Sequence, residues 1–378
     1  MKLWVVGHAY VAELAHGKLQ ALAALPDIDL TLLVPTAWRT ALGLVPLSAP
    51  PAPPYRIVPS RLFRNGRIGA HVYRDGMRAL RRARPDIVQA EVEPWSLAAL
   101  QCALATPAAR LVIFTWENLE APLRRASRAV ERFVLRRAAL VIAGSEAARR
   151  RIARRGVGAE RIAVLPQLGV DPGRYAKRDR AAARSRLGLT PPVIGYIGRL
   201  VPEKGVDVLV EATAPLDARV LLVGDGASRG ALEARVSTWP RGKARFVGAV
   251  TGTDVPEYLA ALDALVLPSR TTATWAEQFG HVLIEAMAAG VPGVATDVGG
   301  VADVLEDSKF GTIVPPDDAE ALAAAINRLL SSSALRCEHG RSARASVLAR
   351  YNLPRLFADI DRLYRSLIAR TSSPPEAH

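Results

Sequence analysis

A glycine turn that carries two basic side chains follows an apolar segment in the second half of the 378-residue chain. The apolar run Val193–Ile197 ends at Gly198 and Arg199. Lys204 and Gly205 then precede a segment with a helical pattern. Backbone N–H groups at the start of a helix bind anions, and Arg and Lys donate charge-assisted hydrogen bonds to phosphate oxygens. These residues therefore suit a diphosphate group. Two surface cations on an ordinary loop are the alternative.

Two carboxylates stand eight residues apart in a later segment. Glu277 is followed by Phe279, Gly280 and His281, and Glu285 lies within an apolar run that predicts a helix. A glutamate in such a run needs a partner, and ribose hydroxyls are suitable because a carboxylate accepts more than one hydrogen bond. The turn before the helix exposes amides that can face a sugar and its phosphate. His281 follows this turn directly and can approach the same phosphate.

A third glycine-rich turn follows the apolar run Arg219–Val223. Its glycines, Gly224, Gly226 and Gly230, do not match the GxGxxG spacing of dinucleotide-binding folds. Neither half of the chain supplies that fingerprint, which argues against a nicotinamide dehydrogenase.

Together these motifs resemble those of the GT-B fold, family 4 retaining glycosyltransferases (glycosyl transferases group 1). The order and spacing agree over residues 193–316, including Ala289-Gly290-Val291-Pro292, and the general layout extends the resemblance to the whole chain. The resemblance implies a UDP- or GDP-sugar donor with its diphosphate on Arg199 and Lys204. It also implies that Glu277 meets hydroxyls of the transferred sugar, and Glu285 the ribose. The donor-binding residues that we expect are Gly198, Arg199, Lys204, Gly224, Glu277, Phe279, Gly280, His281 and Glu285, with Arg199, Lys204 and Glu277 acting in catalysis.

The first half departs from the family pattern in two places. Where members often open with paired glycines, this chain has Gly7-His8 after its first apolar run. Many members carry a histidine near the reaction centre, but the matching segment here reads Phe114-Thr115-Trp116-Glu117-Asn118. The acceptor-side candidates are therefore Gly7, His8, Glu117 and Asn118. A solvated loop histidine is an equal alternative for His8, and Trp116 also fits core packing.

Short apolar runs alternate with helix-length segments along the chain, which predicts βαβ units and mostly parallel sheets. In the first half we expect strands near Lys2–Val6, Asp29–Val34, Tyr55–Val58, Ile87–Ala90, Arg110–Thr115, Leu140–Ala143 and Ile162–Leu165. In the second half we expect Val193–Ile197, Arg219–Val223, Ala244–Val247, Ala264–Leu267, Gly293–Thr296 and Thr312–Val314. The clearest helices are Pro94–Ala105, Ala121–Ala138, Glu146–Arg155, Ala319–Leu330 and Leu353–Ala369.

The predicted fold class is α/β, a GT-B fold of two Rossmann-like domains with a cleft between them. Residues 1–168 form the acceptor-binding domain, 169–192 the linker, and 193–350 the donor-binding domain. Residues 351–378 form a helix that, by the family resemblance, returns to the first domain, and then a polar tail.

The net charge of +14 is concentrated in the first half. Residues 1–168 hold 25 Lys and Arg against 12 Asp and Glu, whereas residues 169–378 hold 25 against 24. An anionic membrane surface, an anionic acceptor or a nucleic acid would each suit this excess. A gene of high GC content, which favours arginine codons, is the alternative explanation. Arg125, Arg128, Arg132 and Arg136 would share one helix face, because side chains three or four residues apart align.

The remaining composition predicts a cytoplasmic enzyme without a metal or cofactor. No apolar segment is long enough to be a signal core or to span a bilayer, and peripheral contact with the inner membrane face stays open. Cys102 and Cys337 form no CxxC motif. The pairs Asp27/Asp29 and Asp359/Asp361 lie away from the expected cleft, and we expect both to be solvated.

The predicted function is transfer of a sugar from a nucleoside-diphosphate sugar to a sugar, lipid-linked or other small acceptor. The resemblance implies a hexosyltransferase-like enzyme of polysaccharide or glycoconjugate biosynthesis that retains the anomeric configuration. Alternatives within the fold are an inverting transferase or a sugar-nucleotide epimerase, against which the glutamate pair argues. A basic nucleic-acid-binding protein is the alternative from another class, although the arginines are not interleaved with aromatic residues.

Overall fold

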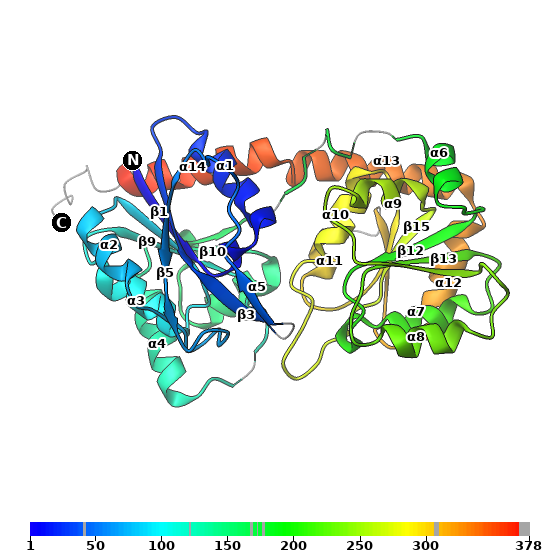
Figure 1. Cartoon of the computed structure of the whole chain (residues 1–378), viewed down its shortest axis with the longest axis horizontal. Helices are drawn as coiled ribbons and strands as arrows, with labels where there is room; N and C mark the ends of the chain where they lie inside the picture. Colours follow the sequence, from blue (N-terminus) through cyan, green and yellow to red (C-terminus); the bar gives the residue numbers. More distant parts are fainter. Residues whose placement is uncertain are drawn as a thin grey trace. The chain divides into compact units, whose positions relative to one another are not determined.

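The computed structural model describes residues 1–40, 43–120, 122–166, 169–171, 173–175, 178–305 and 310–369 (Figure 1). The chain divides into two compact units, one of residues 1–167 with 354–378 and the other of residues 168–353. The predicted polar tail, 371–378, lies outside the described residues, as does part of the predicted linker. The described part of that linker contains helix α6 (Arg180–Arg186), which packs on α9 (Val255–Ala261) of the second unit.

A seven-stranded sheet forms the centre of the first unit, with the order β11-β10-β9-β8-β1-β2-β5. Every neighbouring pair is parallel. The strands are β1 Lys2–Gly7, β2 Asp29–Pro35, β5 Arg56–Ser60, β8 Ile87–Glu91, β9 Arg110–Thr115, β10 Leu140–Ala143 and β11 Ile162–Val164. The seven strands predicted in this half are therefore confirmed to within two residues at their ends.

Two antiparallel hairpins were not predicted. They pair β3 (Ala37–Thr40) with β4 (Gly43–Pro46), and β6 (Leu62–Phe63) with β7 (Val72–Tyr73). Strands of two to four residues are too short to give a period-2 pattern.

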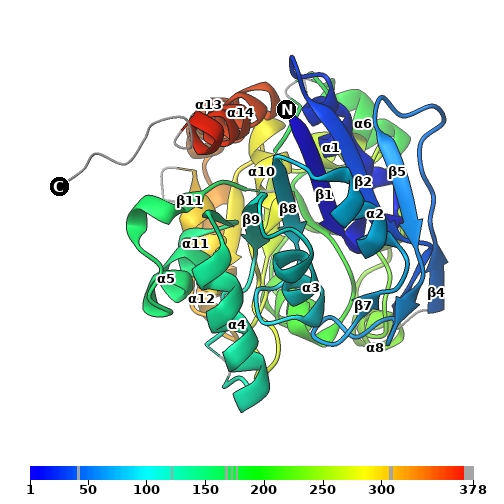
Figure 2. The same cartoon turned by 90° about the vertical axis from the view of Figure 1, so that its left-hand side faces the viewer.

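The side chains of β8 are apolar on one face of the first sheet and mainly polar on the other. Val88 and Ala90 belong to a buried apolar cluster with α2 (Gly76–Ala83), α3 (Leu97–Ala105) and α4 (Arg125–Arg137). Figure 2 shows α3 and α4 side by side. Helix α3 begins three residues later than predicted because Ser96 caps it, accepting a hydrogen bond from the Ala99 amide at 3.2 Å.

Gln89 and Glu91 of β8 point to the opposite face, because side chains alternate along a strand. There Tyr364 of α14 (Leu353–Ala369) donates to Gln89 Oε1 at 2.5 Å. Lys18 donates to Glu91 Oε1 at 2.5 Å, and Tyr10 donates to Glu91 Oε2 at 2.8 Å. This buried polar network joins α14 to the first sheet, which confirms the predicted return of the last helix to the first domain.

The second unit has a six-stranded sheet with the order β14-β13-β12-β15-β16-β17, again parallel throughout. Its strands are β12 Val193–Ile197, β13 Arg219–Val223, β14 Ala244–Gly248, β15 Ala264–Leu267, β16 Gly293–Thr296 and β17 Gly311–Val314. Helices α7 (Val206–Thr213), α8 (Arg229–Val236) and α12 (Ala319–Leu330) pack together, and α10 (His281–Ala288) packs on α9 and α13 (Ser333–Arg350) (Figure 1). The predicted α/β class with two Rossmann-like sheets is confirmed.

The two Asp-x-Asp pairs are engaged by arginines. Asp29 pairs with Arg56 at 3.1 Å, and Asp361 pairs with Arg365 at 2.8 Å. The Asp361 side chain is only 18% exposed, so the expectation that both pairs are solvated is wrong for this residue. Within the described residues, no helix combines the length and the apolar character needed to cross a membrane.

Candidate active site

Three loops meet at the carboxyl edge of the second sheet because glycines let their main chains approach. A Cβ atom on Gly224 would lie 1.8 Å from the Gly198 carbonyl oxygen, and one on Gly226 would lie 2.3 Å from that of Leu200. Gly205 has φ +62°, and a Cβ there would lie 1.9 Å from the carbonyl oxygen of Pro268. No other residue type fits these positions, so the glycines predicted from the sequence have a structural requirement.

Lys204 and Glu277 form an ion pair at this edge. The Lys204 Nζ atom donates to Glu277 Oε2, which also accepts a hydrogen bond from the Ser269 hydroxyl at 2.9 Å. The lysine ammonium lies 4.9 Å from the centre of the Trp275 ring. Both charged side chains are largely buried, with exposed fractions of 15% and 10%. The structure therefore brings together two residues that the sequence predicted separately, for phosphate and for sugar.

Arg199 lies on the exposed side of the same loop. Its side chain is 63% exposed and its guanidinium group is 3.6 Å from Glu203 Oε1. The loop itself is fixed beneath it, because the buried Tyr196 hydroxyl donates to the Arg199 carbonyl oxygen at 2.7 Å. Burial raises the pKa of the Tyr196 hydroxyl, so this group remains a donor. Arg199 is thus anchored by its backbone and keeps a solvent-facing cation.

Glu285 has protein partners that the sequence did not predict. The hydroxyl of Tyr175 donates to Glu285 Oε1 at 2.5 Å, and His281 Nδ1 lies 3.8 Å from the same oxygen. Tyr175 comes from the predicted linker, 110 residues earlier in the chain. Burial and then the nearby Glu285 charge raise the pKa of the tyrosine, which remains protonated. These contacts fix one carboxylate oxygen of the residue predicted to meet the ribose.

The start of α10 has the predicted glycine turn. Gly280 caps the helix with φ +74°, and a Cβ there would lie 2.9 Å from the Leu267 side chain. Phe279 is buried, and its ring packs edge-to-face on Tyr351 at 5.4 Å. Its side chain therefore belongs to the core. The first N–H groups of any α-helix lack partners within the helix, so this end of α10 can bind an anion.

In the first unit, Gly7 is the last residue of β1 and His8 follows it. Gly7 is paired in register with Glu91, and the His8 ring lies tilted by 32° against the Trp38 ring, with 4.2 Å between the centroids. Burial, and to a smaller extent His71, lower the pKa of His8 to about 4, so it is neutral at pH 7. The solvated-loop alternative for His8 is therefore wrong. The aromatic partners Trp38 and His71 had no sequence signal, because they lie 30 or more residues away.

Glu117 and Asn118 follow β9 at the same edge of the first sheet, with β8 between β9 and β1. The Glu117 carboxylate accepts a hydrogen bond from the Leu119 amide at 3.1 Å and thus holds its own turn. Trp116 packs edge-to-face on Phe114 at 5.5 Å, which confirms its packing role.

Glu93 was not predicted as a site residue. It follows β8, which lies between β1 and β9, so it stands between Gly7/His8 and Glu117/Asn118 at this edge of the sheet. Its Oε2 accepts from the Thr115 hydroxyl at 2.5 Å. Burial raises the pKa of Glu93 to about 7. The carboxyl group is therefore partly protonated at neutral pH, at the edge of the sheet where ligands bind in such folds.

The sequence comparisons match most of the chain to two family models. Residues 177–346 match glycosyl transferases group 1, and residues 8–167 match the glycosyl transferase 4-like domain. The alpha-D-kanosaminyltransferase of Streptomyces kanamyceticus is 32% identical over 247 residues, which cover 63% of each chain. The GDP-mannose-dependent alpha-mannosyltransferase of Mycolicibacterium smegmatis is 34% identical over 182 residues, which cover 48% of this chain and 45% of that protein. The matches thus span about half to two thirds of these relatives.

The structure comparison agrees. The crystal structure of Anabaena HepE in complex with UDP superposes with a TM-score of 0.78 at 22% identity, covering 97% of this chain and 100% of that one. At this identity the likeness establishes the fold. The two family models and the fold together show that the chain belongs to the family 4-type glycosyltransferases with the GT-B fold.

Proposed function

We propose that the chain transfers a sugar from a nucleoside-diphosphate sugar to an acceptor, with retention at the anomeric carbon. The observation that carries the proposal is the partly buried Lys204–Glu277 ion pair beside the glycine turn that opens α10. A charge pair removed from water costs desolvation energy and adds little net stability. Its position at the carboxyl edge of a parallel sheet supports a role in ligand binding.

Stabilisation of the leaving group is the main chemical task of the proposed site. When the anomeric C–O bond breaks, negative charge grows on the departing phosphate. Arg199, Lys204 and the amides at the start of α10 would meet that charge in place of a metal ion. Lys204 has three N–H donors, so it can keep Glu277 and still donate to a phosphate oxygen. Glu277 would then accept from hydroxyls of the sugar.

The relatives support a nucleotide-sugar donor and leave its base open. HepE was crystallised with UDP, whereas the mycobacterial relative is named for GDP-mannose. In this chain the proposed contacts go to ribose, diphosphate and sugar, which both donor classes share. Retention is proposed from the family resemblance, with the acceptor attacking on the face that the phosphate leaves.

For the acceptor we propose binding on the first unit, near Gly7, His8, Glu117 and Asn118. The His8 ring, which lies against the buried Trp38, is suited to a hydroxylated ring, because aromatic faces pack on its C–H groups. Neutral His8 has a ring nitrogen that can accept a hydrogen bond from an acceptor hydroxyl, which a protonated histidine lacks.

The proposed function is tested directly by identifying the product that the protein forms from a nucleotide-sugar donor and an acceptor. UDP- and GDP-sugars are first screened by thermal shift, because a ligand that binds only the folded state raises the melting midpoint. The donor that binds is then supplied with small hydroxylated acceptors, and the new linkage is followed by NMR. We expect a product with the anomeric configuration of the donor. An inverted linkage would refute retention, and absence of any nucleotide-dependent stabilisation would refute the donor assignment.

The first site prediction concerns the diphosphate contacts. Arg199→Ala and Lys204→Ala should each reduce kcat by roughly a hundredfold, about 3 kcal/mol, because each removes a cation from a group whose charge grows in the transition state. Arg241→Ala, an exposed arginine of the same unit, is the control and should keep the wild-type rate. Near-normal rates in both site variants would show that the assignment is wrong.

A second site prediction separates the glutamates. Glu285→Gln should weaken binding of the free nucleoside diphosphate by about tenfold, since it removes a charged acceptor for ribose hydroxyls. Glu277→Gln should impair binding of the intact sugar donor and change nucleoside-diphosphate binding little. Calorimetry with both ligands measures this, and Glu211→Gln, whose side chain is 64% exposed, is the control. Equal losses for both ligands in both variants contradict the division of roles.

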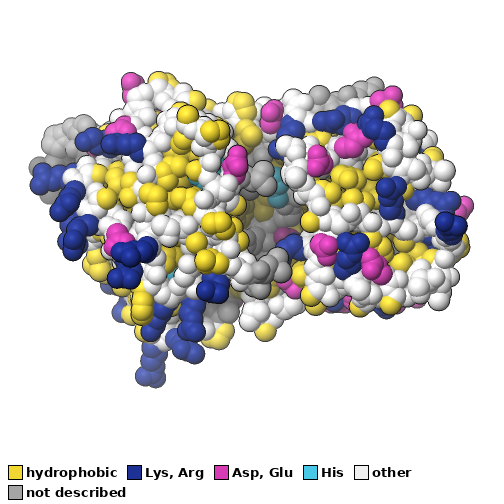
Figure 3. All heavy atoms as spheres, viewed as in Figure 1, with side chains coloured by type: hydrophobic (Ala, Val, Ile, Leu, Met, Phe, Trp, Pro, Cys, Tyr) yellow, Lys and Arg dark blue, Asp and Glu magenta, His cyan; other side chains and the backbone are white. Residues whose placement is uncertain are grey.

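We further propose that the first unit docks on an anionic membrane surface through α4. Arg125, Arg128, Arg132 and Arg136 are all exposed on this helix, and Phe133 beside them is 44% exposed. Dark blue side chains gather along the lower left of Figure 3, where α4 projects in Figure 1. Arg137 and Arg151 do not belong to this exposed basic surface. Arg137 donates to the carbonyls of Thr106, Pro107 and Ala109. Arg151 is buried against Glu131.

The docking prediction is tested by sedimentation with vesicles of increasing anionic lipid content. Each arginine near the surface contributes about 1 kcal/mol, so replacing the four by Gln should reduce binding at low salt by several hundredfold. High salt should weaken binding of the wild type as well, because the attraction is screened. If the wild type does not bind anionic vesicles at low salt, the membrane proposal ends while the transferase proposal remains.

A further inference from the structure

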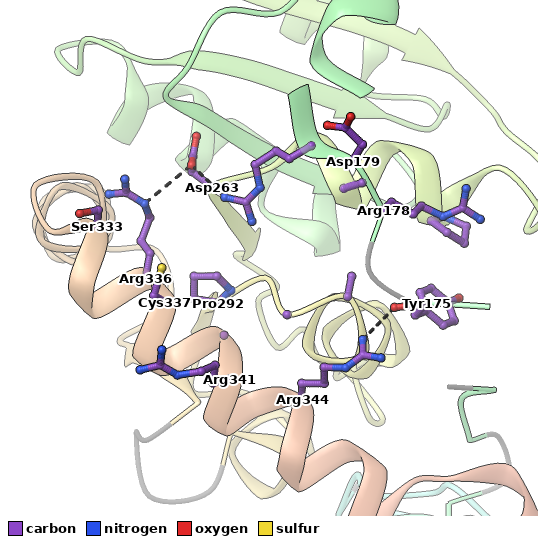
Figure 4. A pocket seen from close by; sticks show the side chains of 16 residues that line it. Tyr175, Arg178, Asp179, Asp263, Pro292, Ser333, Arg336, Cys337, Arg341 and Arg344 are labelled. Carbon is purple, nitrogen blue, oxygen red and sulfur yellow. Dashed lines mark hydrogen bonds and ion pairs between the residues drawn. The ribbon is translucent and has the colours of Figure 1, made fainter. Parts of the chain in front are cut away.

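A cavity of about 960 Å³ lies in the second unit, at the edge of the sheet opposite to the proposed donor site (Figure 4). Asp263 and Pro292 line it, and these residues directly precede β15 and β16. Ala289 and Gly290, just past the end of α10, line it too. The proposed donor site is at the other end of this helix, about 12 Å away at 1.5 Å per residue. The cavity is therefore distinct from the donor site.

Arginines dominate the charge of this cavity. Among the residues that the structure describes, five arginines line it, against two carboxylates, Asp179 and Asp263. These arginines are Arg178, Arg180, Arg336, Arg341 and Arg344. Asp179 is already used as a helix cap, accepting from the amides of Ala181 and Ala182 at 2.9 and 3.1 Å. The cavity thus carries an excess of positive charge.

Asp263 cannot balance the arginines around it. It is 4% exposed and is shared by Arg184 at 2.6 Å, Arg180 at 3.4 Å and Arg336 at 3.7 Å. One negative charge therefore faces three positive charges. Burial lowers the pKa of Arg180, and the nearby Arg184 and Arg336 charges lower it further, in opposition to Asp263. An additional anion would relieve this repulsion.

Arg178 and Arg341 are the cations of the cavity with the fewest protein contacts. Arg178 is 3.9 Å from Glu257, but that carboxylate is already held by Arg186 at 2.5 Å. Arg341 is exposed on α13 (Figure 4). Arg344, in contrast, donates to the carbonyls of Tyr175 and Ala288 and so holds the end of α10. Arg178 and Arg341 can therefore turn toward a ligand without breaking a strong contact.

We propose that this cavity binds a small phosphorylated organic molecule with at least two negative charges. Arg178, Arg341 and the two cavity arginines beside Asp263, Arg180 and Arg336, hold its phosphate groups. The apolar wall formed by Pro256, Ala260 and Pro292 packs on its organic part. Tyr175 also borders the cavity, and its hydroxyl donates to Glu285, so the occupant lies one side chain away from the proposed ribose contact. The binding site does not depend on the proposed function.

The test uses inorganic pyrophosphate as the probe and the Arg199→Ala/Lys204→Ala protein as the background. These two substitutions remove the two cationic diphosphate contacts proposed for the donor site. The further loss of affinity on substituting a cavity arginine then reports the cavity. Calorimetry is done at about 0.15 M salt, where attraction between exposed charges is screened beyond about 8 Å. We expect pyrophosphate to bind this background protein, and binding to weaken about tenfold on adding Arg341→Ala and again on adding Arg178→Ala.

Arg241→Ala in the same background is the matched control and should leave the affinity unchanged. Thermal midpoints without ligand check that each variant folds. Vesicles that contain phosphatidic acid distinguish the source of the phosphate. Because α4 is itself proposed to bind anionic vesicles, weaker vesicle binding on adding Arg178→Ala and Arg341→Ala identifies a lipid headgroup in the cavity. Binding of pyrophosphate without such a change identifies a soluble ligand. The proposal is overturned if neither probe binds the background protein, or if the cavity variants bind as tightly as the control.

Discussion

The ion pair between Lys204 and Glu277 joins two segments that are 73 residues apart in the chain, and the proposed donor site depends on it. Both side chains are mostly removed from water. Their desolvation is offset by mutual attraction and by the hydrogen bond from Ser269 to the same carboxylate. The pair therefore holds the lysine ammonium at a fixed place before any ligand arrives. A cation that is already positioned loses little further freedom when a phosphate binds.

That pair can form only because the loops at this edge pack closely. Gly205 lets the segment that carries Lys204 touch the Pro268 carbonyl, next to Ser269, which also contacts Glu277. In the same way, the absence of a side chain at Gly224 lets its loop approach the Gly198 carbonyl group. A side chain at either position would separate the loops and move the cations. The requirement for glycine at these positions is thus as much a part of the proposed chemistry as the charged side chains are.

Much of this arrangement can be predicted from local sequence. Buried parallel strands such as Val193–Ile197 are continuous apolar runs, and the glycines and charges that follow them mark the loops at their ends. The hairpin of β6 and β7 left no such signal because its strands have only two residues each. The partners of Glu285 and His8 could not be predicted either. Tyr175 is 110 residues from Glu285, and the Trp38 ring reaches His8 from another hairpin, so these contacts exist only after folding.

The separate roles of the arginines could not be predicted for the same reason, because they depend on contacts that form only on folding. In sequence they formed one basic excess, whereas in the structure they separate into different roles. Arg137 caps carbonyl groups, Arg151 forms a buried ion pair, and Arg128 remains on an exposed helix face. The cavity arginines of the second unit were hidden by a near-neutral net charge, because Asp and Glu elsewhere in that half cancel them. Charge counts over a whole half of a chain therefore cannot locate a binding surface.

The proposed donor site requires that a nucleoside diphosphate bind the second unit at the carboxyl edge of its sheet. Amide hydrogen exchange with and without UDP or GDP tests this most directly, because a ligand slows exchange where it suppresses local opening. We expect slower exchange for residues 198–206 and 277–285 with whichever nucleotide binds by calorimetry. Binding that leaves both segments unprotected, and instead slows exchange in the first unit, would contradict it.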